Sequence, residues 1–344
     1  MNGPVSSSNR IDWIDCAKGY AILLVIIGHT VSGVLRGAIF SFHMPLFFIL
    51  SSITFRCSSS REQFIQKAKK AFRHLILPAV AIYLLRTIVF VIQNITEFFS
   101  LQYVIQYAFH RVLTFVLASG VDITMNGVFI ESLGIPWFLI ALFLGRTLFD
   151  YLQFNLKRTA LIISCAALSV AGVILGQLQW LPLSLDVVLA ILPFFLIGNL
   201  LQGKPLNSYV LRNTLVYAVT WAGTLLLSFA FSRNYLELAA RRYTLYPLCY
   251  VTAVSGTLAL AGFSILSLKL GKIIQPLLIL GKHSLVMLFI HCMDYLWEPF
   301  FTAGNPLLDA CLITIADVIV FSVTMQLFRL FSAHRCIIEF CRKR

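Results

Sequence analysis

The stretch TALIISCAALSVAGVILGQLQWLPLSL, residues 159–185, contains no Asp, Glu, Lys or Arg. A helix needs about 20 mostly apolar residues to cross the ~30 Å hydrocarbon core of a bilayer. Within that core every backbone N–H and C=O group must be bonded inside the protein, and an α-helix meets this requirement without other segments. Residues 159–185 therefore predict a membrane-spanning helix, and with it an integral membrane protein.

The composition of the whole chain agrees with this prediction. Of its 344 residues, 59% are hydrophobic and 12% are charged, and the mean hydropathy is +0.87. A water-soluble fold cannot cover that much apolar surface. Working outward from residues 159–185, we expect an all-α bundle of about ten transmembrane helices, at residues 19–35, 37–55, 75–93, 136–151, 159–185, 187–203, 213–232, 243–268, 283–297 and 310–328.

The basic residues predict how this bundle is oriented. Lys and Arg outnumber Asp and Glu by 27 to 14, and 20 of the 27 fall in cytoplasmic segments if the N-terminus is cytoplasmic. The positive charge thus indicates membrane orientation and contact with membrane lipids, and no binding to nucleic acid is expected. Residues 1–344 are predicted to form a single domain with both termini cytoplasmic: an N-terminal segment at 1–18 and a basic tail at 330–344.

One segment does not fit the scheme directly. Residues 101–117 are apolar enough to span a membrane but contain His110 and Arg111. Counting them as a span would invert the side of every later loop. We therefore expect a re-entrant or interfacial helix within an external segment, residues 94–135.

The external arginines and the cysteines complete this outline. Arg233, Arg241 and Arg242 fall in a predicted external loop against the orientation rule, where they would contact an anionic glycan or lipid carrier. The eight cysteines show no CxxC or metal-type spacing. We expect them to be reduced and mostly buried, and we expect no metal site.

Two ionisable side chains stand out in the first apolar run, RIDWIDCAKGYAILLVIIGHT (residues 10–30). Lys18 lies at its inner end and His29 well inside it, where ionisable groups are costly and usually functional. Eleven residues make about three helical turns, so the two side chains share one face with a rise of about 16 Å between them. A ligand could therefore place a charged group at Lys18 and its reactive end at His29. A histidine hydrogen-bonded to a neighbouring helix is the alternative.

Lys18, ten intervening residues and His29 resemble the pattern of the membrane acyltransferase 3 family, and Arg10 and Asp15 precede them as in that family. The similarity extends to the end of the chain. Its other segments are FSFHMPLFFILSS at 40–52, with Ser52 in place of the family's glycine, PWFL at 136–139, and GKHSLVMLFIH at 281–291. Lys70-Ala-Phe-Arg73 resembles the family's paired arginines, with Lys in place of the first.

The resemblance implies an acyl-CoA-dependent O-acyltransferase of extracytoplasmic sugars. The donor would be cytoplasmic acyl-CoA, with acetyl-CoA expected, and no cofactor would be bound. The acceptor would be a surface polysaccharide or a lipid-linked glycan. The enzyme would lie as a multi-pass protein in the bacterial cytoplasmic (inner) membrane.

The same resemblance assigns roles to the residues that match it. The CoA phosphates would be held by Lys18, Lys70, Arg73 and Arg10, although a basic loop beside a membrane also serves as a topology signal or a lipid contact. His29 would be the general base that acts on the acceptor hydroxyl. Brief transfer of the acyl group to its imidazole is the alternative.

Five further residues are candidates for acceptor binding or support. His43 lies near the outer end of the second predicted span, and Trp137 could offer an aromatic face to a sugar ring; both residue types are also common at membrane interfaces. His291 and Ser284 belong to the GKHS stretch, which would serve chemistry or packing. Asp15, three residues before Lys18, could pair with it.

Two other classes of function share these features. A secondary transporter or flippase for a polar glycan would also need charges within the membrane, but it should show two-fold internal repetition. The sequence shows none. A membrane sensor or scaffold would keep the bundle without chemistry, and it would predict that substitution of His29 is harmless.

Overall fold

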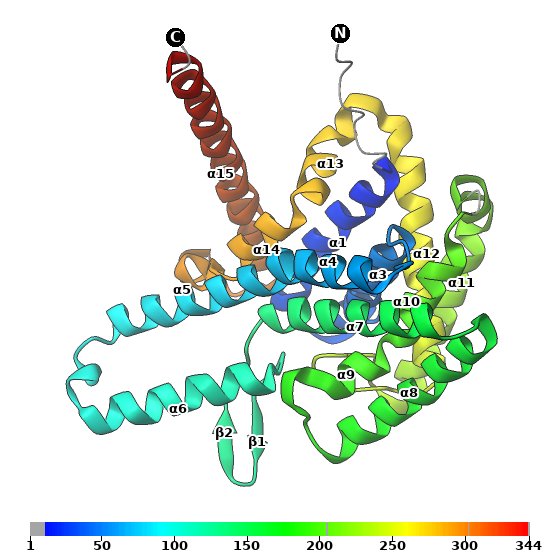
Figure 1. Ribbon diagram of the computed structural model, residues 1–344, viewed down its shortest axis with the longest axis horizontal. Coiled ribbons are helices and arrows are strands. Elements are labelled where there is room, and N and C mark those ends of the chain that lie inside the picture. Colours follow the sequence, from blue (N-terminus) through cyan, green and yellow to red (C-terminus); the bar gives the residue numbers. More distant parts are fainter. Residues whose placement is uncertain (1–10, 204–205, 302, 343–344) are drawn as a thin grey trace. The chain divides into compact units, whose positions relative to one another are not determined.

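The computed structural model describes residues 11–203, 206–301 and 303–342 and is helical apart from one small hairpin (Figure 1). Arg10, one of the expected phosphate ligands, lies outside the described residues. The chain divides into two compact units. The first contains residues 1–36 and 270–344, and the second contains residues 37–269. The chain passes between them within α2 (Gly33–Phe40) and at the start of the 3-10 segment η4 (Leu268–Ile274).

The first unit joins the two ends of the chain. Its other elements are α1 (Asp12–Thr30), α13 (Gln275–Lys282), α14 (Ser284–His291), η5 (Asp294–Leu296), η6 (Glu298–Phe301) and α15 (Pro306–Arg342). Helices α1 and α13 cross closely because each carries a glycine at the crossing. A Cβ at Gly281 would overlap the backbone oxygen of Asp15, and one at Gly19 would overlap the backbone oxygen of Leu277.

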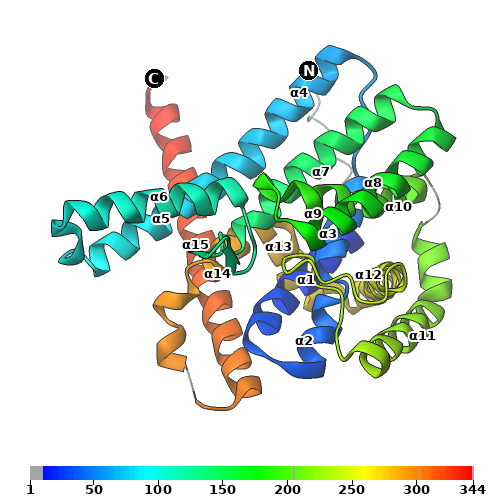
Figure 2. The ribbon, with the colours of Figure 1, turned by 90° about the horizontal axis from the view of Figure 1, so that it is seen from below.

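The second unit contains the remaining elements. They are α3 (His43–Ile53), α4 (Arg61–Ala71), η1 (Phe72–Ile76), α5 (Leu77–Gln93), η2 (Glu97–Phe99), α6 (Leu101–Leu117), β1 (Ile123–Met125), β2 (Val128–Ile130), α7 (Pro136–Asn155), α8 (Arg158–Leu178), η3 (Pro182–Ser184), α9 (Leu185–Ala190), α10 (Leu192–Leu201), α11 (Leu206–Ser232) and α12 (Leu248–Ser267). The strands pair antiparallel, and α11 packs along α12 (Figure 2).

Membrane spans can be assigned by length and hydropathy. Among the described residues, eight helices are long and apolar enough to cross a membrane: Asp12–Thr30, Gly33–Ile53, Arg61–Gln93, Pro136–Asn155, Arg158–Leu178, Ser208–Ser232, Leu248–Lys282 and Pro306–Leu330. A helix pair bent by 48°, Pro182–Ala190 and Leu192–Leu201, would make a ninth span. The predicted span at 283–297 contains only a shorter apolar helix, Ser284–Leu296. The all-α membrane class is confirmed, whereas the count of ten and the cytoplasmic side of the termini stay predictions.

The helix α6 does not meet the length and hydropathy criteria for a span, and its re-entrant or interfacial position stays a prediction. It lies beside α5 (Figure 1), where the Tyr83 hydroxyl donates to the backbone oxygen of Arg111 at 2.6 Å. The Arg111 guanidinium donates to Thr87 at 3.1 Å and pairs with Glu131 at 3.0 Å. Arg111, one of the polar residues that argue against a span at 101–117, thus connects α6 to α5 and to the end of the hairpin.

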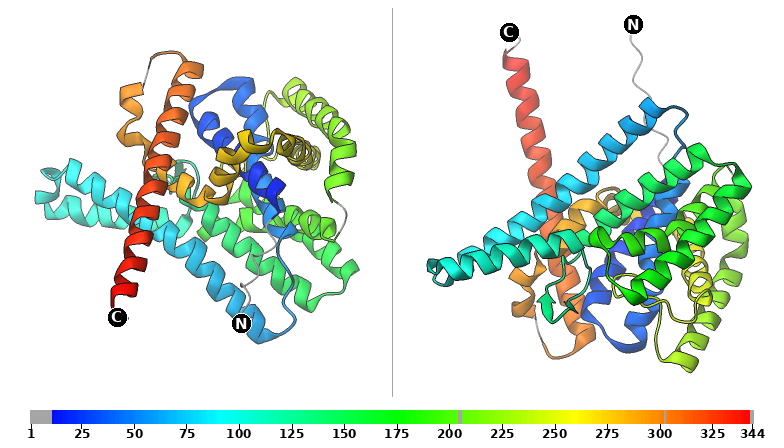
Figure 3. Two further views of the ribbon diagram at one scale, coloured as in Figure 1. Left: turned by 90° about the horizontal axis from the view of Figure 1, so that it is seen from above. Right: turned by 60° about the horizontal axis from the view of Figure 1, so that its bottom comes forward.

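A rod of three segments carries the basic loop predicted from the sequence. The polar helix α4, the π-helical turn η1 and the apolar helix α5 follow one another without a break (Figure 3). Ser60 caps the N-terminus of α4, since its hydroxyl accepts a hydrogen bond from the backbone N–H of Gln63 at 3.2 Å. In η1 the backbone N–H of Leu77 bonds the oxygen of Phe72, five residues earlier. Such a turn holds one more residue than an α-helical turn.

Ser52, the residue that stands in place of the family's glycine, lies where α3 packs closely against α10. Its hydroxyl donates to the backbone oxygen of Phe195 at 2.6 Å. The glycine at this contact lies on the partner helix: a Cβ on Gly198 would lie 2.7 Å from the Cβ of Ser52. Tight helix packing is therefore retained, with the small residue on the opposite helix.

Arg241 is structural rather than an exposed contact for an anionic glycan. Its side chain is 2% exposed and pairs with the fully buried Asp186 at 2.8 Å. It also donates to the Ser184 hydroxyl at 3.0 Å and lies 3.6 Å above the Trp180 ring. Arg242 pairs with Glu237 at 3.2 Å. These pairs explain two of the arginines that break the orientation rule.

Candidate active site

The helix α1 positions the first two candidate residues. Lys18 and His29 both lie within its 19 residues, as expected, so about 16 Å of helix rise separates them on one face. Lys18 is half-buried and His29 is exposed. Asp15 is half-buried one turn before Lys18. An exposed imidazole at the end of an apolar helix is accessible to a ligand.

A second histidine lies beside His29. His291 is the last residue of α14, and its ring centroid is 5.3 Å from that of His29, with 53° between the ring planes. The His291 side chain is 4% exposed. The exposed imidazole of His29 therefore lies against a buried one, although 262 positions separate them in the sequence.

Two carboxylates lie beside His291. Its Nδ1 lies 2.8 Å from Oδ2 of Asp294 and 3.4 Å from Oδ2 of Asp317. Asp317 is fully buried in α15, and its Oδ1 accepts a hydrogen bond from Nε1 of Trp297 at 3.0 Å. A buried carboxylate is tolerated only where such partners compensate its lost hydration. The Nδ1 side of the buried His291 ring thus faces two carboxylates at ion-pair distance.

The His291 imidazole and the two carboxylates beside it could also bind a metal ion. The ligand atoms of His291, Asp294 and Asp317 lie within 4.8 Å of one another. Imidazole and carboxylate are common metal ligands. The sequence prediction of no metal site stays a prediction.

Sequence reasoning missed part of this cluster. The sequence shows Asp317 as a charge within an apolar run, but it does not show that His291 lies beside it. Asp294 and Trp297 were not singled out, although Asp294 follows His291 by three residues, a spacing that brings side chains together on a helical turn.

The GKHS stretch has a packing role. Gly281 permits the crossing of α1 and α13 beside the backbone of Asp15. Ser284 is the half-buried first residue of α14. Within residues 281–291, His291 is the residue whose side chain contacts His29.

Other candidates lie in the second unit. His43 is 3% exposed; its Nδ1 lies 3.1 Å from the backbone oxygen of Ile39, and its ring centroid is 4.6 Å from that of Phe40. Trp137 is 5% exposed in the first turn of α7 and packs against Gly120. Both rings are buried, so neither lies on an open face.

Lys70 and Arg73 are exposed, on α4 and in η1. Neither side chain forms a hydrogen bond or ion pair with another residue in the part of the chain that the structure describes. They are one turn apart and belong to the second unit, whereas Lys18 belongs to the first. Cations without acidic partners are suited to bind phosphate.

Asp122 and Glu131, two acids within residues 94–135, are both engaged by partners in the second unit. Asp122 accepts a hydrogen bond from the backbone N–H of Ser132 at 2.7 Å. Glu131 pairs with Arg111. In the first unit, Asp294 and Asp317 contact the His291 member of the histidine pair.

Comparison with known proteins agrees with the motifs. Nodulation protein NolL of Mesorhizobium japonicum (strain LMG 29417 / CECT 9101 / MAFF 303099) is 25% identical over 247 residues, which are 66% of this chain and 56% of that protein. The chain thus spans little more than half the length of this curated relative. No solved structure matches the chain. Residues 11–325 match the model of a family described as an acyltransferase domain, and the chain therefore belongs to the membrane acyltransferase 3 family.

Proposed function

We propose that the protein is an O-acyltransferase that moves an acyl group from cytoplasmic acyl-CoA to a hydroxyl of an extracytoplasmic or lipid-linked glycan. Acetyl is the expected acyl group, and the bacterial cytoplasmic membrane is the expected location. One observation carries the proposal: the exposed His29 lies against a buried histidine whose Nδ1 faces two carboxylates. Family membership supports acyl transfer as the class of reaction.

His29 acts as the general base in this proposal. Its imidazole takes the proton from the acceptor hydroxyl while the hydroxyl oxygen attacks the thioester carbonyl carbon. The C–S bond then breaks, and the CoA thiolate leaves and takes up a proton. The negative charge of Asp294 and Asp317, with His291 between them and His29, stabilises the imidazolium that forms on His29 during the reaction.

The donor phosphates are held by Lys18, Lys70 and Arg73. Replacing Lys70 and Arg73 together by Gln raises KM for acyl-CoA about tenfold or more, because each charge-assisted contact to phosphate is lost. An unchanged KM would remove both residues from the donor site. Arg158→Gln, at the first residue of α8, is the matched control.

The test of the proposed function is transfer of radiolabel from acetyl-CoA to membrane glycan. Membranes that contain wild type, His29→Ala or His110→Ala are compared at equal protein level; His110 is an exposed histidine on α6 and serves as the control. Wild type and His110→Ala should transfer label, whereas His29→Ala should lose activity by a factor of about 10² to 10⁴. Undiminished transfer by His29→Ala would refute the assignment of the base.

A further inference from the structure

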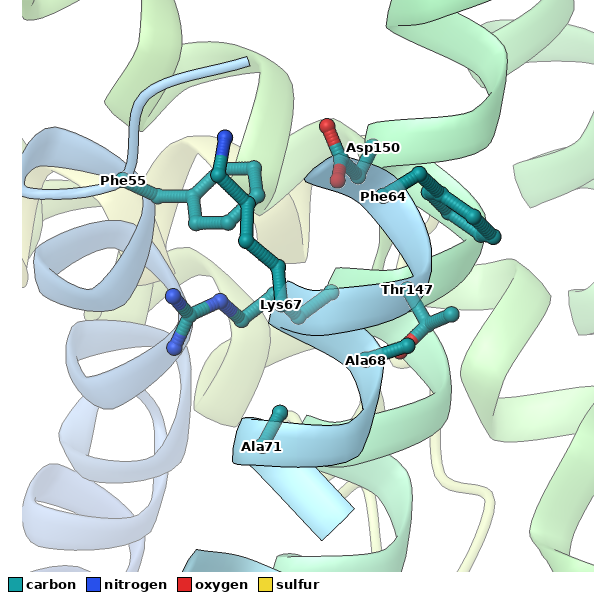
Figure 4. A pocket seen from close by; sticks show the side chains of 8 residues that line it. Phe55, Phe64, Lys67, Ala68, Ala71, Thr147 and Asp150 are labelled. Atoms are coloured by element: carbon teal, nitrogen blue, oxygen red, sulfur yellow. The ribbon is translucent and has the colours of Figure 1, made fainter. Parts of the chain in front are cut away.

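A small hollow in the second unit is lined by two cationic side chains and by one aromatic ring that both contact. It is formed between α4, α7 and the end of α3, and has an empty volume of about 210 Å³ that includes open solvent (Figure 4). Lys67 and the small residues Ala68 and Ala71 contribute from α4, and Arg146 and Asp150 contribute from α7. The alanines leave the space that longer side chains would fill.

Both cations lie over the ring of Phe55. The Lys67 Nζ is 5.2 Å from the ring centroid, and the Arg146 Cζ is 4.4 Å from it. Phe55 itself is 6% exposed. One aromatic ring thus has two like charges beside it, and their repulsion is unfavourable unless an anion compensates them.

Asp150, the acid in the wall, lies close enough to Arg146 to act on its charge but forms no direct ion pair with either cation. Both oxygens of Asp150 are engaged by Ser58, through its backbone N–H at 2.9 Å and its hydroxyl at 2.7 Å. Lys67 donates to the backbone oxygen of Arg56 at 2.8 Å. Arg146 is half-buried, and its guanidinium has no hydrogen bond or ion pair with any residue that the structure describes. Five N–H donors of a half-buried guanidinium are therefore available to a ligand.

We propose that this hollow is a phosphate site in which Arg146 and Lys67 bind the phosphate oxygens and Phe55 forms the apolar wall. The planar fork of a guanidinium matches two phosphate oxygens, and an ammonium adds a point charge. Lys70, an exposed residue one turn beyond Lys67 on α4, adds a further positive charge to this helix. The phosphate would come from the coenzyme A of the donor or from a phospholipid headgroup. The first source rests on the proposed function; the phosphate site itself does not.

The test is direct binding to the full-length protein in detergent, independent of acyl transfer. Pyrophosphate and coenzyme A are titrated into wild type, Lys67→Gln, Arg146→Gln and Lys69→Gln. Lys69 is exposed on the same helix and does not line the hollow, so its variant is the control. We expect the first two substitutions to weaken binding of both probes about tenfold or more and the control to change it less than about twofold.

A parallel arm distinguishes the source of the phosphate. Native mass spectrometry measures retention of phosphatidylglycerol by the same variants. Weakened coenzyme A binding with retained lipid assigns the hollow to the donor. Lost lipid with unchanged coenzyme A binding keeps the phosphate site and assigns it to a headgroup. If neither ligand responds to either substitution, the phosphate site is refuted.

Wild-type protein provides a check that does not depend on the folding of variants. Saturating pyrophosphate should protect Lys67, but not Lys69, from acetylation by acetic anhydride, as read by peptide mass spectrometry. Equal modification of Lys67 with and without pyrophosphate would overturn the proposal. Binding that persists in His29→Ala, or in a wild type that transfers no label, leaves the phosphate site intact while the proposed function fails.

Discussion

The imidazole of His29 lies 5.3 Å, centroid to centroid, from the imidazole of His291, which is bounded on its Nδ1 side by Asp294 and Asp317. If this cluster orients the base, Asp317→Asn and His291→Gln should lower kcat by a factor on the order of 10², the cost of a small misplacement of a catalytic group. KM for acyl-CoA should stay within about twofold. Steady-state kinetics at matched expression measures both. Equal loss of kcat in Asp309→Asn, an acid on the same helix, would point instead to general damage to α15.

The ion pair of Arg241 with Asp186 should stabilise the second unit only as a pair. Arg241→Met leaves a buried carboxylate without its partner, and we expect the free energy of unfolding to fall by about 3–5 kcal/mol. Adding Asp186→Leu should restore part of this loss, because no unpaired charge then remains. Thermal unfolding in detergent measures both variants. A double variant less stable than Arg241→Met would contradict the pairing argument.

The crossing of α1 and α13 depends on the absence of a side chain at Gly281. Gly281→Ala should lower the melting temperature, because the new methyl group meets the backbone of Asp15, which cannot move aside as a flexible side chain could. Gly223→Ala on α11 is the matched control, since no neighbouring atom lies within 4 Å of its Cβ position. Alanine there should be neutral or stabilising. Equal effects of the two substitutions would mean that the crossing is not tight.

The predicted orientation can be tested at Cys57, in the loop before α4. Burial, and next the negative charge of Asp150, raise the pKa of the Cys57 thiol. The reactive thiolate is therefore scarce at neutral pH and increases as the pH rises, so maleimide labelling should be faster at about pH 8.5 than at pH 7. A membrane-impermeant maleimide should modify Cys57 only after cells are opened. Thr124→Cys in the hairpin should be modified in intact cells, and the reverse pattern would invert the topology.

Much of the fold was predictable because lipid imposes a simple rule on sequence. Charge-free runs such as residues 159–185 and 213–232 had to become spans, and the structure has helices there. The bend between α9 and α10 coincides with Pro193 at the start of α10, because proline cannot continue the hydrogen bonding of a preceding helix. Lys18 and His29 could be placed on one face because both lie on one helix, whose period is fixed.

The partners of buried charges were much less predictable. Nothing local to Asp317 indicates that α15 brings it to His291, because the register of two packed helices depends on all their contacts. Arg241 and Asp186 are 55 positions apart, and loop charge alone suggested an external ligand for Arg241. Sequence reasoning therefore identified charged groups that had to be compensated but not the groups that compensate them.

The wide turn at Phe72–Ile76 has a consequence for how this membrane protein can change. One additional residue in a helix turns everything after it by about 100°. The wide turn thus sets the angle between the basic face of α4 and the exposed apolar side of α5 within one rod. A single deletion at this turn would swing Lys67 and Lys70 away from their present direction while leaving α5 seated in the bilayer. Deletion of one residue at this turn, without any substitution in α4, would therefore change which ligands the basic side chains of α4 can contact.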